Sequence, residues 1–76
     1  MNVCNLKQGE KGIVVSIDGD AKLKKRLLAL GCIEGTKVEY KICAPLGDPM
    51  IINFRGFNLA IRKNDAKNIS IRTKEN

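Results

Sequence analysis

The chain has 76 residues, a formal net charge of +6 and a hydrophobic content of 43%. A chain this short buries about 60% of its extended surface on folding, which excludes a deep pocket enclosed between two domains. We therefore expect one domain over residues 1–76. The hydrophobic content is that of a folded globule and argues against a disordered chain. The charge permits an anionic partner, but it is also ordinary for the solubility of a small domain.

The sequence favours a cytoplasmic location without direct membrane insertion. No apolar run approaches the ~20 residues that a membrane-spanning helix needs. The first residues show neither a long apolar region nor a small-residue cleavage site, so we expect no signal peptide. The cysteines are odd in number and cannot all pair within one chain, so we expect free thiols in a reducing compartment: Cys4, Cys32 and Cys43. The second and third are interpreted as core residues, while the exposure of Cys4 stays open.

The first half of the chain contains a predicted strand, a helix and a second strand. A β-branched run predicts a strand over residues 13–17. Asp20 is a suitable N-cap for a helix over residues 21–30, whose buried face is expected to consist of Leu23, Leu27 and Leu30. Residues 38–42 alternate between apolar and polar, which predicts a strand with Val38, Tyr40 and Ile42 on its buried face.

The second half contains a hairpin that can be checked internally. A two-residue turn at Arg55–Gly56 brings six apolar residues onto one core-facing side, in the pairs Phe54 with Phe57, Ile52 with Leu59 and Met50 with Ile61. After the hairpin, Asn64 is expected to cap a helical turn over residues 65–67. Ile69 and Ile71 then predict a last short strand, and residues 73–76 predict a frayed polar tail.

Together these elements predict a mainly β fold of about five short strands, with one short helix and a helical turn. Strands alone would leave sheet edges open, so we expect closure into a small β-barrel. A sheet edge that stays unpaired can pair with the edge of a second copy of the chain, so a homodimer is an alternative to the monomer.

Residues for catalysis or for a cofactor are not signalled. The chain has no histidine, which is the usual general base and metal ligand. The cysteines lack CxxC spacing, and no glycine-rich phosphate-binding motif occurs. We therefore expect a binding surface without enzymatic activity, and no cofactor or metal site is evident.

Two segments are candidates for that surface. Prolines restrict the loop over residues 44–49, so an exposed Leu46 would be held ready for a partner; alternatively, Leu46 packs back into the core. The predicted helix carries Lys22, Lys24, Lys25 and Arg26, which either contact an anionic partner or form an ordinary solvated face. A small basic barrel can also bind nucleic acid, which is the alternative function. The aromatic residues are assigned to the core, so nucleic acid is not the expected partner.

An ordered set of motifs from Leu6 to Ile71 resembles the FeoA family of bacterial ferrous-iron uptake. It comprises Leu6-x-x-Gly9, Arg26-Leu27-x-x-Leu30-Gly31, Gly35-Thr36-x-Val38, Ala44-Pro45-Leu46-Gly47-Asp48-Pro49, Arg55-Gly56 and Leu59-Ala60-Ile61-Arg62-x-x-x-Ala66. The resemblance implies an SH3-like β-barrel that is accessory to the membrane transporter FeoB and acts on its cytosolic GTPase portion. It implies association with ferrous iron, a transition metal ion, but no ligand set can be assigned to residues of this sequence.

On this basis we expect the partner surface to include the loop, with the helix face complementing acidic residues of the partner. The candidate residues are Pro45, Leu46, Gly47, Asp48, Pro49, Lys25 and Arg26.

Overall fold

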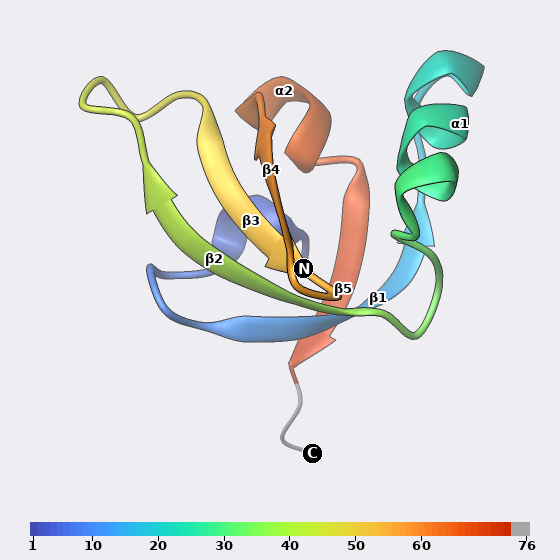
Figure 1. Cartoon of the computed structure of the whole chain (residues 1–76), viewed down its shortest axis with the longest axis horizontal. Helices are drawn as coiled ribbons and strands as arrows, with labels where there is room; N and C mark the ends of the chain where they lie inside the picture. The colour runs from blue at the N-terminus through green and yellow to red at the C-terminus, as the bar shows by residue number, and fades with distance from the viewer. Residues whose placement is uncertain (74–76) are drawn as a thin grey trace.

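A computed structural model describes residues 1–73 of the chain, and these form one antiparallel sheet with short helices around it (Figure 1). The strand order is β4-β3-β2-β1-β5. The strands are β1 (Lys11–Ile17), β2 (Lys37–Cys43), β3 (Met50–Phe54), β4 (Phe57–Ile61) and β5 (Ile69–Thr73). The helices are the 3₁₀ turn η1 (Val3–Asn5), α1 (Ala21–Leu30) and α2 (Lys63–Ala66). The mainly β prediction is confirmed. The predicted polar tail begins within β5, and its residues 74–76 lie outside the described residues.

Helix α1 has the predicted bounds and the predicted N-cap. The carboxylate of Asp20 accepts a hydrogen bond from the backbone N–H of Leu23 at 2.9 Å. At the other end Gly31 has φ +91°, the left-handed conformation that commonly ends a helix. Leu23 and Leu27 are buried in the core and Leu30 packs against it, so the apolar face docks the helix on the sheet.

The β3–β4 hairpin has the predicted register at every pair from Met50–Ile61 to Phe54–Phe57. Arg55 and Gly56 have φ +55° and +80°, which is the sign that a two-residue type I′ turn requires at both positions. The prediction that Phe57 lies in the core is wrong, because its side chain is 44% exposed. Phe57 begins β4, which ends the sheet, so no further strand covers it; its ring meets Phe54 edge-on at 5.8 Å.

Strand β2 departs from the predicted alternation at its end. Tyr40 pairs with Ile52 and Ile42 pairs with Ile51, so Lys41 is an extra residue in a β-bulge. The bulge reverses which side chains face inward. Ile42, predicted on the buried face, is therefore 53% exposed, and Cys43 packs against the core instead.

The core gathers apolar side chains from every strand, from both helices and from the N-terminal turn. Its residues include Val3, Val14, Leu27, Cys32, Val38, Ile52, Phe54, Ile61, Ala66 and Ile69. The N-terminal segment follows β5: Asn2 bridges to Ser70, and Met1 O accepts from the backbone N–H of Ile71 at 2.9 Å. Within residues 1–73, no helix has the length and apolar character needed to cross a membrane.

Candidate functional site

The loop between β2 and β3, residues 44–49, is called the Leu46 loop here. Its backbone closes on itself, because Ala44 N–H donates to Pro49 O at 2.9 Å and Gly47 N–H donates to Ala44 O at 2.7 Å. Gly47 has φ +92°, which suits glycine in this tight turn. The side chain of Leu46 is 96% exposed. The sequence left two alternatives for Leu46, exposure to solvent or packing into the core, and the structure shows the exposed one.

Asp48 connects the base of this loop to α2. Its Oδ1 accepts a hydrogen bond from the backbone N–H of Lys63 at 2.8 Å. Lys63 is the first residue of α2, whose N-cap position, Arg62, supplies no side-chain cap. The prediction that Asn64 caps this turn is wrong, because the helix begins at Lys63, two residues before the predicted start, and the acceptor comes from a distant loop.

Lys63 also contacts the N-terminal segment. The thiol of Cys4 lies 3.4 Å from Lys63 O, to which it donates. The loop is thus fixed at its base by contacts to α2, and α2 in turn contacts the first residues of the chain. A loop fixed in this way presents an apolar side chain with little conformational entropy left to lose on binding, which favours recognition of a partner.

The basic residues of α1 are all exposed: Lys22, Lys24, Lys25 and Arg26. None of them forms an ion pair with another of the described residues, among which only Lys41 and Glu39 do so, at 3.7 Å. Lys25 and Arg26 do not come together with the Leu46 loop. Figure 1 shows α1 and the β2–β3 loop on opposite sides of the molecule. A partner that contacts both must therefore extend across the molecule or bind on two sides.

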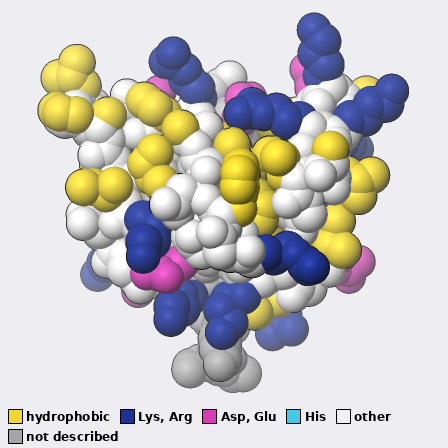
Figure 2. All heavy atoms as spheres, viewed as in Figure 1, with side chains coloured by type: hydrophobic (Ala, Val, Ile, Leu, Met, Phe, Trp, Pro, Cys, Tyr) yellow, Lys and Arg dark blue, Asp and Glu magenta, His cyan; other side chains and the backbone are white. Residues whose placement is uncertain are grey.

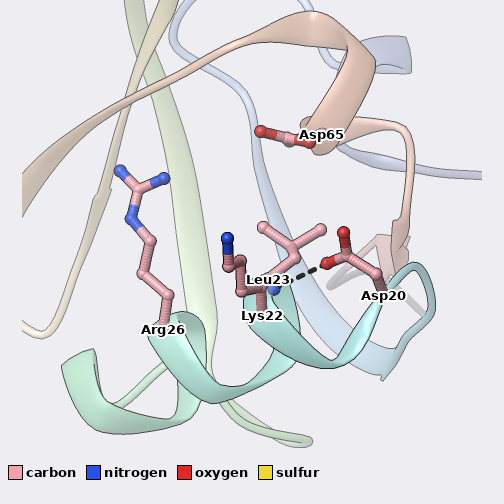
Figure 3. Close-up of a pocket in the computed structure, with 5 residues that line it drawn as sticks. All are labelled: Asp20, Lys22, Leu23, Arg26 and Asp65. Carbon is pink, nitrogen blue, oxygen red and sulfur yellow. Dashed lines mark hydrogen bonds between the residues drawn. The ribbon is translucent and has the colours of Figure 1, made fainter.

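Two of these cations border a hollow of about 370 Å³ between α1 and α2 (Figure 3). It is lined by Asp20, Lys22, Leu23, Arg26 and Asp65. Asp65 lines the hollow from α2, while the carboxylate of Asp20 is already used as the cap of α1. Because both signs of charge line this hollow, it is poorly suited to a simple anion such as phosphate.

The cysteines are placed for packing. Cys32 is fully buried, which confirms its predicted core position, and burial raises the pKa of its thiol to about 11. Cys4 is half-buried, and burial raises its pKa despite the opposing effect of Lys63. A hydrogen bond with Cys43 raises the pKa of Tyr40. A raised thiol pKa lowers the thiolate fraction, which is the reactive form.

Within residues 1–73, no three side chains of the histidine, cysteine or carboxylate type come together as a group that could hold a metal ion.

One surface was not found by sequence reasoning. Val15, Leu28 and Ile33 are exposed and line a second hollow, of about 330 Å³, between β1 and α1. The buried face predicted for the helix, Leu23, Leu27 and Leu30, does not include Leu28. No sequence signal brought it together with residues from β1 and from the segment after α1.

Comparisons with known proteins identify the family. The FeoA domain model matches residues 1–73. The chain is 30% identical over 71 residues to an Fe(2+) transport protein A/Fe(2+) transporter FeoB fusion protein of Porphyromonas gingivalis (strain ATCC BAA-308 / W83). That match covers 93% of this chain but only 8% of the length of the fusion protein.

Two solved structures share the fold. The solution structure of the FeoA protein from Chlorobium tepidum has a TM-score of 0.93 and 34% identity, covering 97% of this chain and 70% of that one. The crystal structure of Stenotrophomonas maltophilia FeoA in complex with zinc has a TM-score of 0.81 and 25% identity, covering 93% and 88%. The latter is described as a procaryotic SH3 domain protein, which agrees with the predicted SH3-like fold. The chain therefore belongs to the FeoA family.

Proposed function

We propose that this chain is a non-enzymatic accessory module of ferrous-iron uptake that acts on the cytosolic GTPase portion of a FeoB-type membrane transporter. Membership of the FeoA family supports this, since that family consists of small accessory domains. The P. gingivalis relative supports it further, because there the FeoA-like segment and the transporter are one chain. Covalent fusion raises the effective concentration of one partner at the other, which suits a contact between them. The proposal places this chain in the cytoplasm.

The observation that carries the proposal on this chain is the exposure of Leu46. A leucine that is 96% exposed on a loop closed by its own hydrogen bonds is costly to leave in water and ready to bind. Figure 2, in the same view as Figure 1, shows hydrophobic side chains projecting at the corner where the β2–β3 loop lies. We assign the partner contact to Pro45, Leu46, Gly47 and Pro49, with Asp48 holding the loop in position.

The basic residues of α1 supply the second part of the contact. Lys25 and Arg26 are exposed and have no ion-pair partner among the described residues. Complementary charge across an interface accelerates association and fixes orientation. Acidic residues on the GTPase portion would therefore speed the encounter, while the Leu46 loop would slow dissociation.

A binding assay tests the proposal. The chain is immobilised and presented with the cytosolic GTPase portion of the cognate transporter, at low and at moderate salt, with duplex DNA and single-stranded RNA as controls. We expect saturable binding to the transporter portion that weakens modestly with salt. Binding to the nucleic acids alone, with the steep salt dependence of counterion release, would favour the small basic barrel as a nucleic-acid binder and overturn the proposal.

A further inference from the structure

The sheet ends in β4 on one side and in β5 on the other, and the two edges differ. The N-terminal segment pairs with part of the β5 edge, where Met1 O accepts from the backbone N–H of Ile71. Strand β4 pairs with β3 alone. Within residues 1–73, Asn58 and Ala60 make no backbone hydrogen bond outside the hairpin, and both are exposed. The outer side of β4 is therefore a free edge.

The hairpin register determines which backbone groups point to this edge. In a two-residue hairpin the residues that flank the turn exchange both backbone hydrogen bonds, and the same arrangement recurs at every second residue. Phe57, Leu59 and Ile61 therefore bond to β3. The N–H and C=O groups of Asn58 and Ala60 point away from β3 and are free to pair with another strand.

Strand β4 lacks the usual protection of a free edge. Edge strands are commonly protected against pairing by charged side chains, proline or a β-bulge. The sequence of β4 is uncharged and without proline, and its pairing with β3 is regular throughout. Its core-facing side is incompletely covered as well, since Phe57 is 44% exposed. An added strand would pair the free backbone groups and cover the Phe57 ring.

The free backbone groups select a polypeptide as the occupant. An extended chain offers both hydrogen-bond donors and acceptors at the spacing of a β-ladder. Phosphate groups of lipid or nucleic acid supply acceptors only, which would leave the C=O groups of Asn58 and Ala60 unpaired. The edge therefore fits the addition of a strand from a protein.

Cations at both ends of β4 distinguish a partner protein from a second copy of this chain. Arg55 precedes the strand, Arg62 and Lys63 follow it, and all three are exposed. None of them forms an ion pair with another of the described residues. Two copies related by two-fold symmetry would pair along β4 in antiparallel fashion, which brings Arg55 of each copy toward Arg62 and Lys63 of the other. A segment with acidic residues at its ends would be attracted there instead.

We propose that the free edge of β4 accepts an extended segment of a partner protein as an additional strand, with acidic residues of that segment near the two ends of β4. The inference rests on the proposed function, in which the partner is the cytosolic GTPase portion of the transporter. The edge adjoins the Leu46 loop, because Ile61 pairs with Met50, the residue that follows the loop. One partner therefore reaches both the edge and the loop.

Amide hydrogen exchange tests the edge without any substitution. The N–H groups of Leu59 and Ile61 bond to β3, so they should exchange slowly in the free chain and in the complex. Those of Asn58 and Ala60 should exchange rapidly in the free chain and at least about tenfold more slowly when the transporter portion is bound. Binding without protection of Asn58 and Ala60 would overturn the inference and leave the proposed function standing. Failure of the chain to bind would overturn both.

Two variants at one position test whether the backbone group itself is needed. Ala60→Pro removes an N–H that points away from β3, where an edge strand accommodates proline, and the ring obstructs an incoming strand. Ala60→Val keeps the N–H and favours extended backbone. We expect Ala60→Pro to weaken the Kd for the transporter portion at least about tenfold, and Ala60→Val to stay within about twofold of wild type. Wild-type affinity in Ala60→Pro, or equal weakening by the two variants, would contradict strand addition.

A charge reversal tests the acidic character of the segment. Arg62→Glu should weaken binding at least about threefold, mainly through slower association. Lys7→Glu makes the same change of charge at an exposed residue before β1, two strands away from β3, and should bind as wild type does. Equal affinity of Arg62→Glu and Lys7→Glu would show that the segment is not acidic at this end.

Sedimentation velocity examines the competing occupant, a second copy of the chain. We expect wild type and Ala60→Pro to sediment alike, as monomers. A wild-type dimer that Ala60→Pro dissociates would assign the edge to self-association and contradict the inference.

Discussion

The carboxylate of Asp48 accepts a hydrogen bond from the backbone N–H of Lys63 at 2.8 Å, across 15 residues of sequence. The first N–H groups of a helix have no partner within that helix, so Asp48 satisfies one that α2 leaves free. The same contact fixes the loop that carries Leu46. One side chain thus links the start of a helix to the position of the candidate binding residue.

Asp48→Ala should destabilise the fold slightly and loosen the Leu46 loop. Loss of a helix-capping side chain costs roughly 0.5–2 kcal/mol, and the exposure of Asp48 places it at the lower end. Asp48→Asn keeps an oxygen acceptor and should lose less. Urea unfolding of the three proteins measures the difference. Identical stability of Asp48→Ala and wild type would show that the contact contributes nothing.

Stability should fall between pH 9 and pH 11 through Cys32. Burial raises the pKa of its thiol from 9.0 to about 11, so the folded chain holds this proton more tightly than the unfolded chain. The stabilisation is fully present below pH 9 and is lost as the pH rises toward 11. The loss is on the order of 2 to 3 kcal/mol.

The comparison is with Cys32→Ala, which removes only the thiol and leaves the other ionisable groups in place. We expect the difference in unfolding free energy between wild type and Cys32→Ala to shrink as the pH rises. Parallel pH profiles for the two proteins would rule out this role of the buried thiol.

Gly56→Ala should destabilise the β3–β4 hairpin through the backbone alone. A Cβ at this position would meet no atom within 4 Å, but Gly56 has φ +80°, which disfavours alanine. The expected cost is about 1 kcal/mol. Gly56→Asn serves as the control, because asparagine tolerates positive φ and should cost less. Thermal unfolding distinguishes the two, and an alanine variant as stable as the asparagine variant would contradict the turn geometry.

The register of the hairpin was predictable because its two strands carry the same strict alternation on both sides of a glycine turn. Any slip by one residue would have mixed the apolar and polar faces. The other face of the hairpin is consistent with the same register, because Asn53 and Asn58 pair there and their side chains are joined by a hydrogen bond of 2.7 Å. Helix α1 was predictable for a similar reason, since its cap, its apolar face and its terminal glycine are all local signals.

The features that sequence reasoning missed depend on contacts between distant segments. The bulge at Lys41 changes which side chains of β2 face inward. The alternation of apolar and polar residues in the sequence does not reveal that one extra residue is inserted there. The cap of α2 comes from Asp48 rather than from the neighbouring Asn64. The second hollow, between β1 and α1, combines side chains from β1, α1 and the following turn, which only the folded chain brings together. By contrast, the Leu46 loop was recognisable because its two prolines, Pro45 and Pro49, lie within the loop itself.

The central claim is that Leu46 binds the transporter, and a calorimetric titration tests it most directly. Wild type, Leu46→Asp and Leu46→Met are each titrated into the cytosolic GTPase portion of the cognate transporter. Since Leu46 is 96% exposed, all three should unfold at the same urea concentration within error. The account predicts saturable binding by wild type and Leu46→Met, and at least about a tenfold loss for Leu46→Asp. Wild-type affinity in Leu46→Asp, or no binding by any of the three, would contradict it.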